Sequence, residues 1–268
     1  QWLFGAGDRA VSPDDIPQPE KTIARVARSN SIDFFDRAQL TARKYFIPHA
    51  IVPVKLKLFG RESRVRWFPD YEGKDISWSV DVALYLANKL STEGASAIFL
   101  PQRRSFPKAY RRIADLCRRG GALTELERSV NPDEMAKIDA LLSLHYGESP
   151  YSEGVRLGIL PHYSQLPDGV KRAIEGAIKR GDARCVICTQ TLAQGVNLPI
   201  RDLFVTGRYT SRSALDVREF QNLIGRAVRS GAYNEGTVFI TDGKAENRIG
   251  WREYAKYFDG GALEDCAS

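Results

Sequence analysis

From about residue 77 onward, helix-period patterns alternate with short runs of uninterrupted apolar residues. Recurrence of apolar residues three and four apart predicts helices at Val80–Leu90, Phe106–Arg119, Pro132–Tyr146, Pro167–Arg180, Glu219–Gly231 and Asn247–Phe258. The apolar runs predict strands at Ala97–Leu100, Val155–Leu160, Arg184–Thr189, Asp202–Thr206 and Gly236–Thr241. Ser213 and Asp216 offer a capping box for the helix that carries Glu219. This alternation predicts an α/β fold, with a mainly parallel sheet, right-handed crossovers and helices on both faces.

The preceding part of the chain has a different pattern. Partial apolar periodicity over Ser31–Lys44 is compatible with a helix, and His49–Phe59 alternates as an edge strand does. A turn and a second strand, Val65–Phe68, complete a possible β-hairpin. We interpret residues 1–76 as a linker or the remnant of a preceding domain, and residues 77–268 as a second domain.

The composition, 43% hydrophobic and 27% charged, is that of an ordinary globular protein. The formal charge of +6 favours a polyanionic partner, but only weakly. The sequence shows no apolar run long enough to span a membrane and no signal peptide, so we expect no membrane partner and an intracellular location, cytoplasmic, nucleoid or nuclear. Because the chain opens on Gln1 rather than Met, we expect it to be a piece of a longer protein.

The four cysteines do not form a disulfide framework in a chain of 268 residues. Cys185 and Cys188 have the C-x-x-C spacing of some zinc sites, but residues three apart on a strand point to opposite faces. No second Cys or His pair follows at zinc spacing. Buried thiols are the favoured interpretation, and we expect no bound metal from this segment.

The helix predicted at Phe106–Arg119 carries basic residues on the face opposite its apolar side chains: Lys108, Arg111, Arg112, Arg118 and Arg119. A charge run of this kind is usually a solvated helix face. We favour that interpretation over a dedicated nucleic-acid groove.

Two stretches carry the strongest indication of chemistry. In Cys185–Pro199 a buried strand breaks at a hydroxyl-rich turn, which is where open α/β sheets place their ligands. In Glu219–Gly231, the side chains Asn222, Arg226 and Arg229 share one helix face. Paired guanidinium groups on a rigid helix suit phosphate recognition. Taken alone, the two arginines are equally compatible with surface ion pairs.

Three motifs occur in a fixed order: HYSQLPDGVKRAIEGAIKRG, CVICTQTLAQGVNLP and FQNLIGRAVRSG. Together they resemble the C-terminal RecA-like domain of superfamily-2 helicases, and within these the Ski-type branch of the DExH group. The resemblance runs from roughly Ala97 to Thr241. It implies that the chain contributes to an ATP-driven motor that acts on a DNA or RNA strand.

The resemblance also implies which residues contact the strand. Phe99–Arg104 resembles motif IV, and His162–Leu166 resembles the loop after the next strand, which approaches the nucleic-acid backbone. Thr189–Pro199 resembles motif V, in which the Thr189 hydroxyl and nearby backbone N–H groups hold a phosphate. The nucleic-acid contacts implied are Arg103, His162, Gln165, Thr189, Gln190 and Thr191.

For the nucleotide, the resemblance implies contacts from two segments. Gly195 allows close backbone approach, and Asn197 lies near the ribose. Gly225–Arg229 resembles motif VI, where Arg226 and Arg229 reach ATP and Arg229 is the expected arginine finger.

Two positions depart from the family pattern. Asn222 stands where the family has Gln, and Gln221 precedes it, so either amide is a candidate to contact the nucleotide. Val228 replaces a glycine, which keeps both arginines in helical phase.

The sequence has no G-x-x-x-x-G-K-[ST] phosphate loop and no DExH tetrad. ATP with Mg is therefore expected to bind mainly to an N-terminal RecA-like domain of the same protein, and this piece alone should not hydrolyse it. Our leading hypothesis is the second motor domain of a helicase or translocase. The alternatives are a non-catalytic helicase-fold module that binds nucleic acid or a protein, and an ATP-driven remodeller that does not separate strands.

Overall fold

The computed structural model describes residues 34–35, 42–43, 53–60, 62–70, 76–121, 123–147, 150–190, 198–210, 213–227, 236–242, 253–254 and 256–258. Its centre is a sheet of five strands: β5 (Ala95–Phe99), β6 (Ile159–His162), β7 (Cys185–Cys188), β8 (Ile200–Val205) and β9 (Thr237–Ile240). Their order across the sheet is β6-β7-β5-β8-β9, and every pairing within it is parallel. The predicted fold class, an α/β domain with a parallel sheet, is confirmed.

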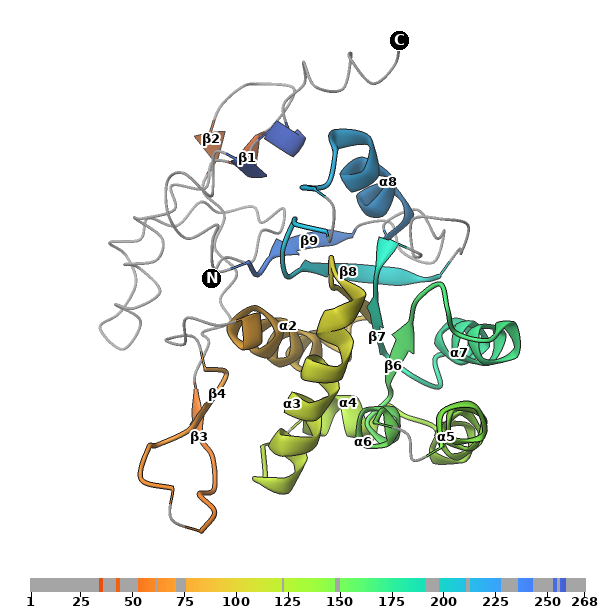
Figure 1. The fold of residues 1–268 in the computed structure, drawn as a ribbon. Helices are drawn as coiled ribbons and strands as arrows, with labels where there is room; N and C mark the ends of the chain where they lie inside the picture. The colour runs from red at the N-terminus through yellow and green to blue at the C-terminus, as the bar shows by residue number, and fades with distance from the viewer. Residues whose placement is uncertain are drawn as a thin grey trace.

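Helices cover both faces of the sheet. They are α2 (Ile76–Leu90), α3 (Phe106–Arg118), α4 (Thr124–Arg128), α5 (Pro132–Tyr146), α6 (Ser152–Arg156), α7 (Asp168–Arg180) and α8 (Val217–Ala227). Figure 1 shows α2 and α3 on one side of the sheet and α7 and α8 on the other. For α3, α7 and α8 this division follows from right-handed crossovers. The connection from β5 to β6 crosses the sheet in one direction, whereas the connections from β6 to β7 and from β8 to β9 cross it in the opposite direction. No helix in the described part of the chain is long and apolar enough to cross a membrane.

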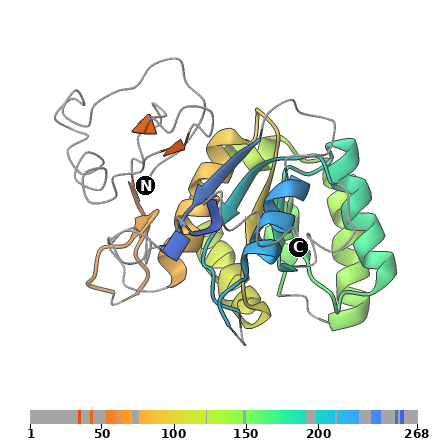
Figure 2. The same cartoon turned by 90° about the horizontal axis from the view of Figure 1, so that it is seen from above.

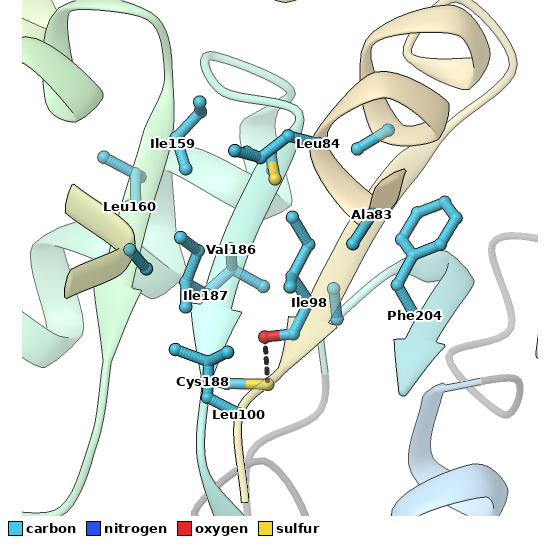
Figure 3. Close-up of a cluster of buried hydrophobic side chains, with 14 of the residues drawn as sticks. Ala83, Leu84, Ile98, Leu100, Ile159, Leu160, Val186, Ile187, Cys188 and Phe204 are labelled. Carbon is cyan, nitrogen blue, oxygen red and sulfur yellow. Dashed lines mark hydrogen bonds between the residues drawn. The ribbon is translucent and has the colours of Figure 1, made fainter. Parts of the chain in front are cut away.

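The core lies between α2 and the central strands. β5 and β7 are buried along their whole length, because neighbours cover both of their faces and both of their edges. Figure 3 shows Leu84 of α2, Ile98 of β5 and Ile187 of β7 as members of one buried cluster. This explains why these strands read as continuous apolar runs rather than alternating ones.

Cys185 and Cys188 are both fully buried in β7, so the thiol interpretation is confirmed. The Cys188 thiol donates to the carbonyl oxygen of Ile98 at 3.7 Å (Figure 3). Burial raises the pKa of Cys185 to about 12. Both side chains therefore act as small apolar groups at neutral pH.

Helix ends follow local chemistry. The Asn131 side chain caps α5, and α7 ends at Gly181, whose φ of 80° favours glycine. The capping box predicted at Ser213 and Asp216 was placed three residues too early. The Asp216 and Glu219 side chains instead accept reciprocal hydrogen bonds from each other's backbone N–H groups, at 2.6 and 3.2 Å.

Two further element predictions were wrong. The strand expected at Val155–Leu160 begins only at Ile159, because Ser152–Arg156 forms α6 and Val155 enters the core from that helix. A five-residue helix is too short to show its period in the sequence.

In the region where a helix was expected at Ser31–Lys44, β1 (Phe34–Phe35) pairs antiparallel with β2 (Ala42–Arg43). The last predicted helix lies mostly outside the described residues. Within the described part, Glu253–Tyr254 is helical and η6 (Lys256–Phe258) is a 3₁₀ turn.

A small hairpin packs on the α2–α3 side of the domain. It consists of β3 (Val54–Lys55) and β4 (Trp67–Phe68), paired antiparallel where the alternation predicts a hairpin. Leu56 and Phe68 are 3% and 2% exposed and belong to the same hydrophobic core as the sheet.

Two arginines of the predicted solvated face fix this hairpin. Arg112 donates to both carboxylate oxygens of the fully buried Asp81, at 2.8 and 2.6 Å, and to the Trp67 carbonyl at 3.2 Å. The solvated-face interpretation was therefore wrong for Arg112.

It was also wrong for Arg119, which donates to the Lys57 carbonyl at 2.9 Å and to both oxygens of Glu62, at 2.7 and 2.9 Å. A planar guanidinium can meet a carboxylate and a carbonyl together, so each arginine ties side chain and backbone of another segment to α3. Arg111 and Arg118 remain exposed as expected.

Asp202 is a buried acid whose ionisation destabilises the folded state. It is 2% exposed, and its Oδ2 has no hydrogen-bond partner in the described part of the chain. Its register partner on β5, Ser96, likewise leaves its hydroxyl unpaired there. Burial raises the pKa of Asp202 from 3.8 to about 6.

We predict that Asp202→Asn stabilises the chain at neutral pH. Below about pH 4, both the folded and the unfolded state hold the proton and Asp202 adds no cost. Between about pH 4 and 6, the Asp202 carboxyl ionises readily only in the unfolded state, so the free energy of unfolding falls as the pH rises. Above about pH 6 the full loss of stability, roughly 3 kcal/mol at most, is present. Urea unfolding across this range should show the gain of Asp202→Asn near neutrality and its disappearance in acid. Asp133→Asn, at an exposed position, serves as the control, and an equal gain at every pH would contradict the account.

Candidate nucleic-acid and nucleotide interface

The loops that follow β5, β6 and β7 meet at one edge of the sheet. The Leu100 N–H donates to the Cys188 carbonyl at 2.8 Å, and the Thr189 N–H donates to the His162 carbonyl at 3.3 Å. On the other side, the Thr206 N–H and hydroxyl both donate to the Phe99 carbonyl, at 3.2 and 2.8 Å. The carboxyl edge of an open parallel sheet is where such folds bind ligands.

Thr189 and Gln190 lie at the centre of this edge. They follow β7, which is flanked by β6 and β5, and both are partly exposed. The Thr189 N–H is used by the His162 carbonyl, so the amide of this residue is bonded within the sheet edge. Thr191, Gly195 and Asn197, which complete the expected motif, lie outside the described residues.

Arg103 lies on η3 (Arg103–Ser105), in the segment that follows β5 at the same edge, and is exposed. Its guanidinium carbon is 5.3 Å from the centroid of the Tyr163 ring, within range of a cation–π contact.

Tyr163 is itself fixed: it is 2% exposed, and its hydroxyl lies 3.1 Å from that of Tyr151 and 3.3 Å from that of Tyr146. Burial raises the pKa of Tyr163, so the ring stays neutral. A rigid aromatic platform thus supports an exposed cation at the edge of the sheet.

His162 does not lie where the sequence predicted. It is the last residue of β6 rather than part of the loop, and its side chain is 1% exposed. Its Nε2 is 3.0 Å from Glu175 Oε1 on α7. A buried imidazole offers no surface to a nucleic-acid strand, so the direct contact expected of His162 was wrong. The side chain instead joins β6 to α7 through its hydrogen bond with Glu175. Gln165, three residues later, is exposed.

The candidate nucleotide contacts lie on α8, which follows β8. Gln221 is partly exposed, but its Nε2 is buried and has no acceptor in the described part of the chain, whereas Asn222 is exposed. Arg226 lies on the same helix, but its side chain is outside the described residues, as is the whole of Arg229.

Aromatic contacts hold α8 in place. The Phe220 ring stacks on Tyr257, with centroids 4.3 Å apart, and the Tyr257 hydroxyl donates to the Leu215 carbonyl at 2.7 Å. Leu215 lies two residues before the helix begins, so both its start and its first turn are anchored.

Sequence reasoning missed Gln102, which links the two halves of the edge. Its Nε2 donates to the carbonyl oxygens of Tyr209 and Thr210, at 3.0 and 3.1 Å. These carbonyls belong to the turn between β8 and α8. The only sequence signal is a polar residue directly after a buried strand, which does not reveal a partner more than a hundred residues away.

Arg208, in the segment that follows β8, was also missed. Its guanidinium pairs with Glu253 at 3.2 Å, donates to the Tyr209 hydroxyl at 2.7 Å and lies 4.4 Å from the centre of that ring. It therefore orders the exposed Tyr209 on the same turn that Gln102 holds.

No protein-family model matches the chain. It is 25% identical over 214 residues to the Hachiman protein HamB of Bacillus cereus, a match that covers 79% of this chain and 18% of that protein. It is 26% identical over 167 residues to a POLQ-like helicase of Drosophila melanogaster, covering 62% of this chain and 16% of the relative. Among solved structures, S. cerevisiae Dbp5 bound to RNA and ADP BeF3 covers 69% of this chain with 37% of its own, at 16% identity and a TM-score of 0.44.

The similarity to relatives described as helicases supports a helicase-like domain. The relatives therefore support the general part of the resemblance, a helicase-like domain, and not the particular branch that the three motifs suggest. The chain spans less than a fifth of the length of the two curated relatives.

We predict that Gln102→Ala destabilises the chain by about 1–2 kcal/mol, because one exposed and one partly buried hydrogen bond are lost. Chemical denaturation measures the loss. Hydrogen exchange should also become faster in the turn that contains Tyr209. Gln165→Ala, an exposed glutamine on the neighbouring loop, should change stability by less than about 0.5 kcal/mol. Equal effects of the two variants would contradict the linking role of Gln102.

Proposed function

We propose that this chain is the second motor domain of an ATP-dependent nucleic-acid helicase or translocase. The observation that carries the proposal is the placement of Arg103, Thr189 and Gln190 on one carboxyl edge, in a chain similar in sequence to helicases. Assignment to superfamily 2, to the DExH group and to its Ski-type branch is part of the same proposal. It is supported by the order of the three motifs.

The strand is held through its phosphates. The Thr189 hydroxyl and the Arg103 guanidinium are a donor and a cation that need no particular base, and Gln190 adds an amide next to Thr189 in the chain. Binding is therefore weakly sequence-specific and sensitive to salt. Because Tyr163 orients Arg103, the cation is presented without a large loss of side-chain freedom.

ATP hydrolysis needs a partner domain. ATP with Mg, held mainly by the first motor domain of the same protein, supplies the reaction that drives movement. Within this chain, Gln221 or Asn222 contacts the nucleotide, and Arg226 and Arg229 approach its phosphates. Arg229 stabilises the charge that develops during phosphoryl transfer, an effect typically worth about 10³–10⁵ in rate. Closure of the two domains brings these residues to the nucleotide.

Arg229→Ala in the intact protein should abolish nucleic-acid-stimulated ATP hydrolysis, with a fall of at least about 10³-fold, and leave strand affinity nearly unchanged. Steady-state hydrolysis and strand binding measured on the same preparation check both parts. Arg172→Ala, an exposed arginine of α7, should hydrolyse ATP normally. Normal turnover of Arg229→Ala would refute the finger assignment, and strand binding without any hydrolysis by the unaltered intact protein would favour a non-catalytic module.

Thr189→Ala in the intact protein should weaken the coupling of hydrolysis to the strand. The concentration of single-stranded DNA or RNA needed for half-maximal stimulation should rise by about 10-fold, as expected for loss of a hydrogen bond to a charged phosphate. Thr189→Ser keeps the hydroxyl and should retain stimulation. If Thr189→Ala and Thr189→Ser are stimulated alike, the hydroxyl does not hold the strand.

A further inference from the structure

The face of the β3–β4 hairpin that points away from the core is both aromatic and basic. Lys55 lies directly opposite Trp67 in the hairpin register. The Leu56 N–H donates to the Arg66 carbonyl at 2.8 Å, which continues the ladder and sets Lys57 opposite Val65. These four residues, Lys55, Lys57, Val65 and Trp67, form the outer hairpin face. All four are exposed, and Trp67 is 44% exposed.

The opposite face of the hairpin is partly occupied. Leu56 and Phe68 are buried in the core, and Arg112 holds the backbone carbonyl of Trp67 itself. The outer hairpin face is thus presented from a backbone that is fixed to α3. Because successive strand residues point to opposite faces, the residues that alternate with Leu56 and Phe68 point away from the core.

Within the described residues, the positive charge of this face has no carboxylate partner. Of the residues that the structure describes, no carboxylate forms an ion pair with Lys55 or Lys57. The hairpin's Glu62 is engaged by Arg119, which lowers the pKa of Glu62 to about 2. The Lys57 Nζ lies 5.7 Å from the centroid of Phe59, an exposed aromatic residue near the hairpin turn.

We propose that the outer hairpin face binds single-stranded nucleic acid. A base stacks on Trp67, and Lys55 and Lys57 contact the adjoining phosphates. An aromatic side chain beside cations on a shallow surface is the arrangement that binds single strands without regard to sequence. Lysine is depleted at protein–protein interfaces, which favours a strand over a protein partner.

This contact is separate from the carboxyl edge. α3 begins at that edge and ends at Arg118, about 20 Å away for 13 residues. The hairpin docks against the middle and the far end of this helix, through Arg112 and Arg119. The proposal adds a second strand contact to the proposed function and does not depend on ATP hydrolysis.

The test is strand binding by the chain itself. Fluorescence anisotropy with a short labelled oligothymidylate and a matching oligouridylate is measured over a salt series. Trp67→Ala should weaken binding by about 5- to 150-fold, the range for loss of one stacked base. The double variant Lys55→Glu/Lys57→Glu should lower the steepness of the log affinity–log salt plot by about 1.4, because two phosphate contacts are lost.

A matched control carries the same change of charge elsewhere. Lys137→Glu/Lys179→Glu alters exposed lysines of α5 and α7, which Figures 1 and 2 both show on the side of the molecule away from the hairpin. It should bind with nearly the unaltered salt dependence. Thermal unfolding of each variant verifies that it is folded, which we expect because the substituted side chains are exposed.

Hairpin variants that bind the strand as the control does would overturn the proposal. So would hairpin variants of the intact protein that keep strand affinity but lose the association of the two motor domains, since that result identifies a protein interface. Thr189→Ala in the same assay separates this proposal from the proposed function. An effect of Thr189→Ala without an effect of Trp67→Ala supports the proposed function and rules out the hairpin contact. An effect of Trp67→Ala without an effect of Thr189→Ala supports the hairpin contact and counts against the strand contact at Thr189.

Discussion

Parallel pairing of β5 with both β7 and β8 is the constraint on which the rest of the structure depends. Parallel strands end at the same edge of a sheet, so the residues that follow them converge although they are far apart in sequence. Arg103, Thr189 and Arg208 follow three adjacent strands of the sheet for this reason alone. The burial of β5 and β7 along their whole length stabilises their pairing. Side-chain hydrogen bonds, such as that from Gln102 to the Tyr209 carbonyl, join the segments that follow the strands.

A second constraint is the pair of arginines on α3. Arg112 and Arg119 join the β3–β4 hairpin to the domain through bonds that combine a carboxylate with a backbone carbonyl. Removing one partner of the Asp81–Arg112 pair would leave a buried charge unpaired, which is more costly than the pair is stabilising. The hairpin therefore moves with this domain. Any strand contact on its outer face is coupled to the same rigid unit as the carboxyl edge.

Much of the fold was predictable from the sequence, because the period of apolar residues in a long segment distinguishes a helix from a strand. The helix at Pro132–Tyr146 and the buried strand around Cys185–Cys188 were predicted closely, since each has an unambiguous period or run. The short helix at Ser152–Arg156 was not, because five residues do not complete enough turns to display a pattern. Tertiary partners decided the remaining errors. Arg112 and Arg119 look solvated in sequence, and only the docked hairpin supplies their carboxylate and carbonyl partners.

The site was predictable to a similar degree. The positions of Thr189 and Arg103 after buried strands were visible as polar residues that end apolar runs. The burial of His162 against Glu175 was not, because it depends on how α7 packs across β6. Tyr163 was missed as the support of Arg103, since an aromatic residue next to a strand looks like core. Interactions between side chains from different elements leave little trace in a single sequence.

The central claim is that the carboxyl edge of β5, β6 and β7 holds a nucleic-acid strand. Hydrogen exchange of the chain with and without a saturating single-stranded oligonucleotide tests it most directly. The account predicts slower exchange at residues 103–105 and 189–190 and no change in α5, which lies away from that edge. Unchanged exchange at both edge segments, under conditions in which the strand is bound, would contradict it.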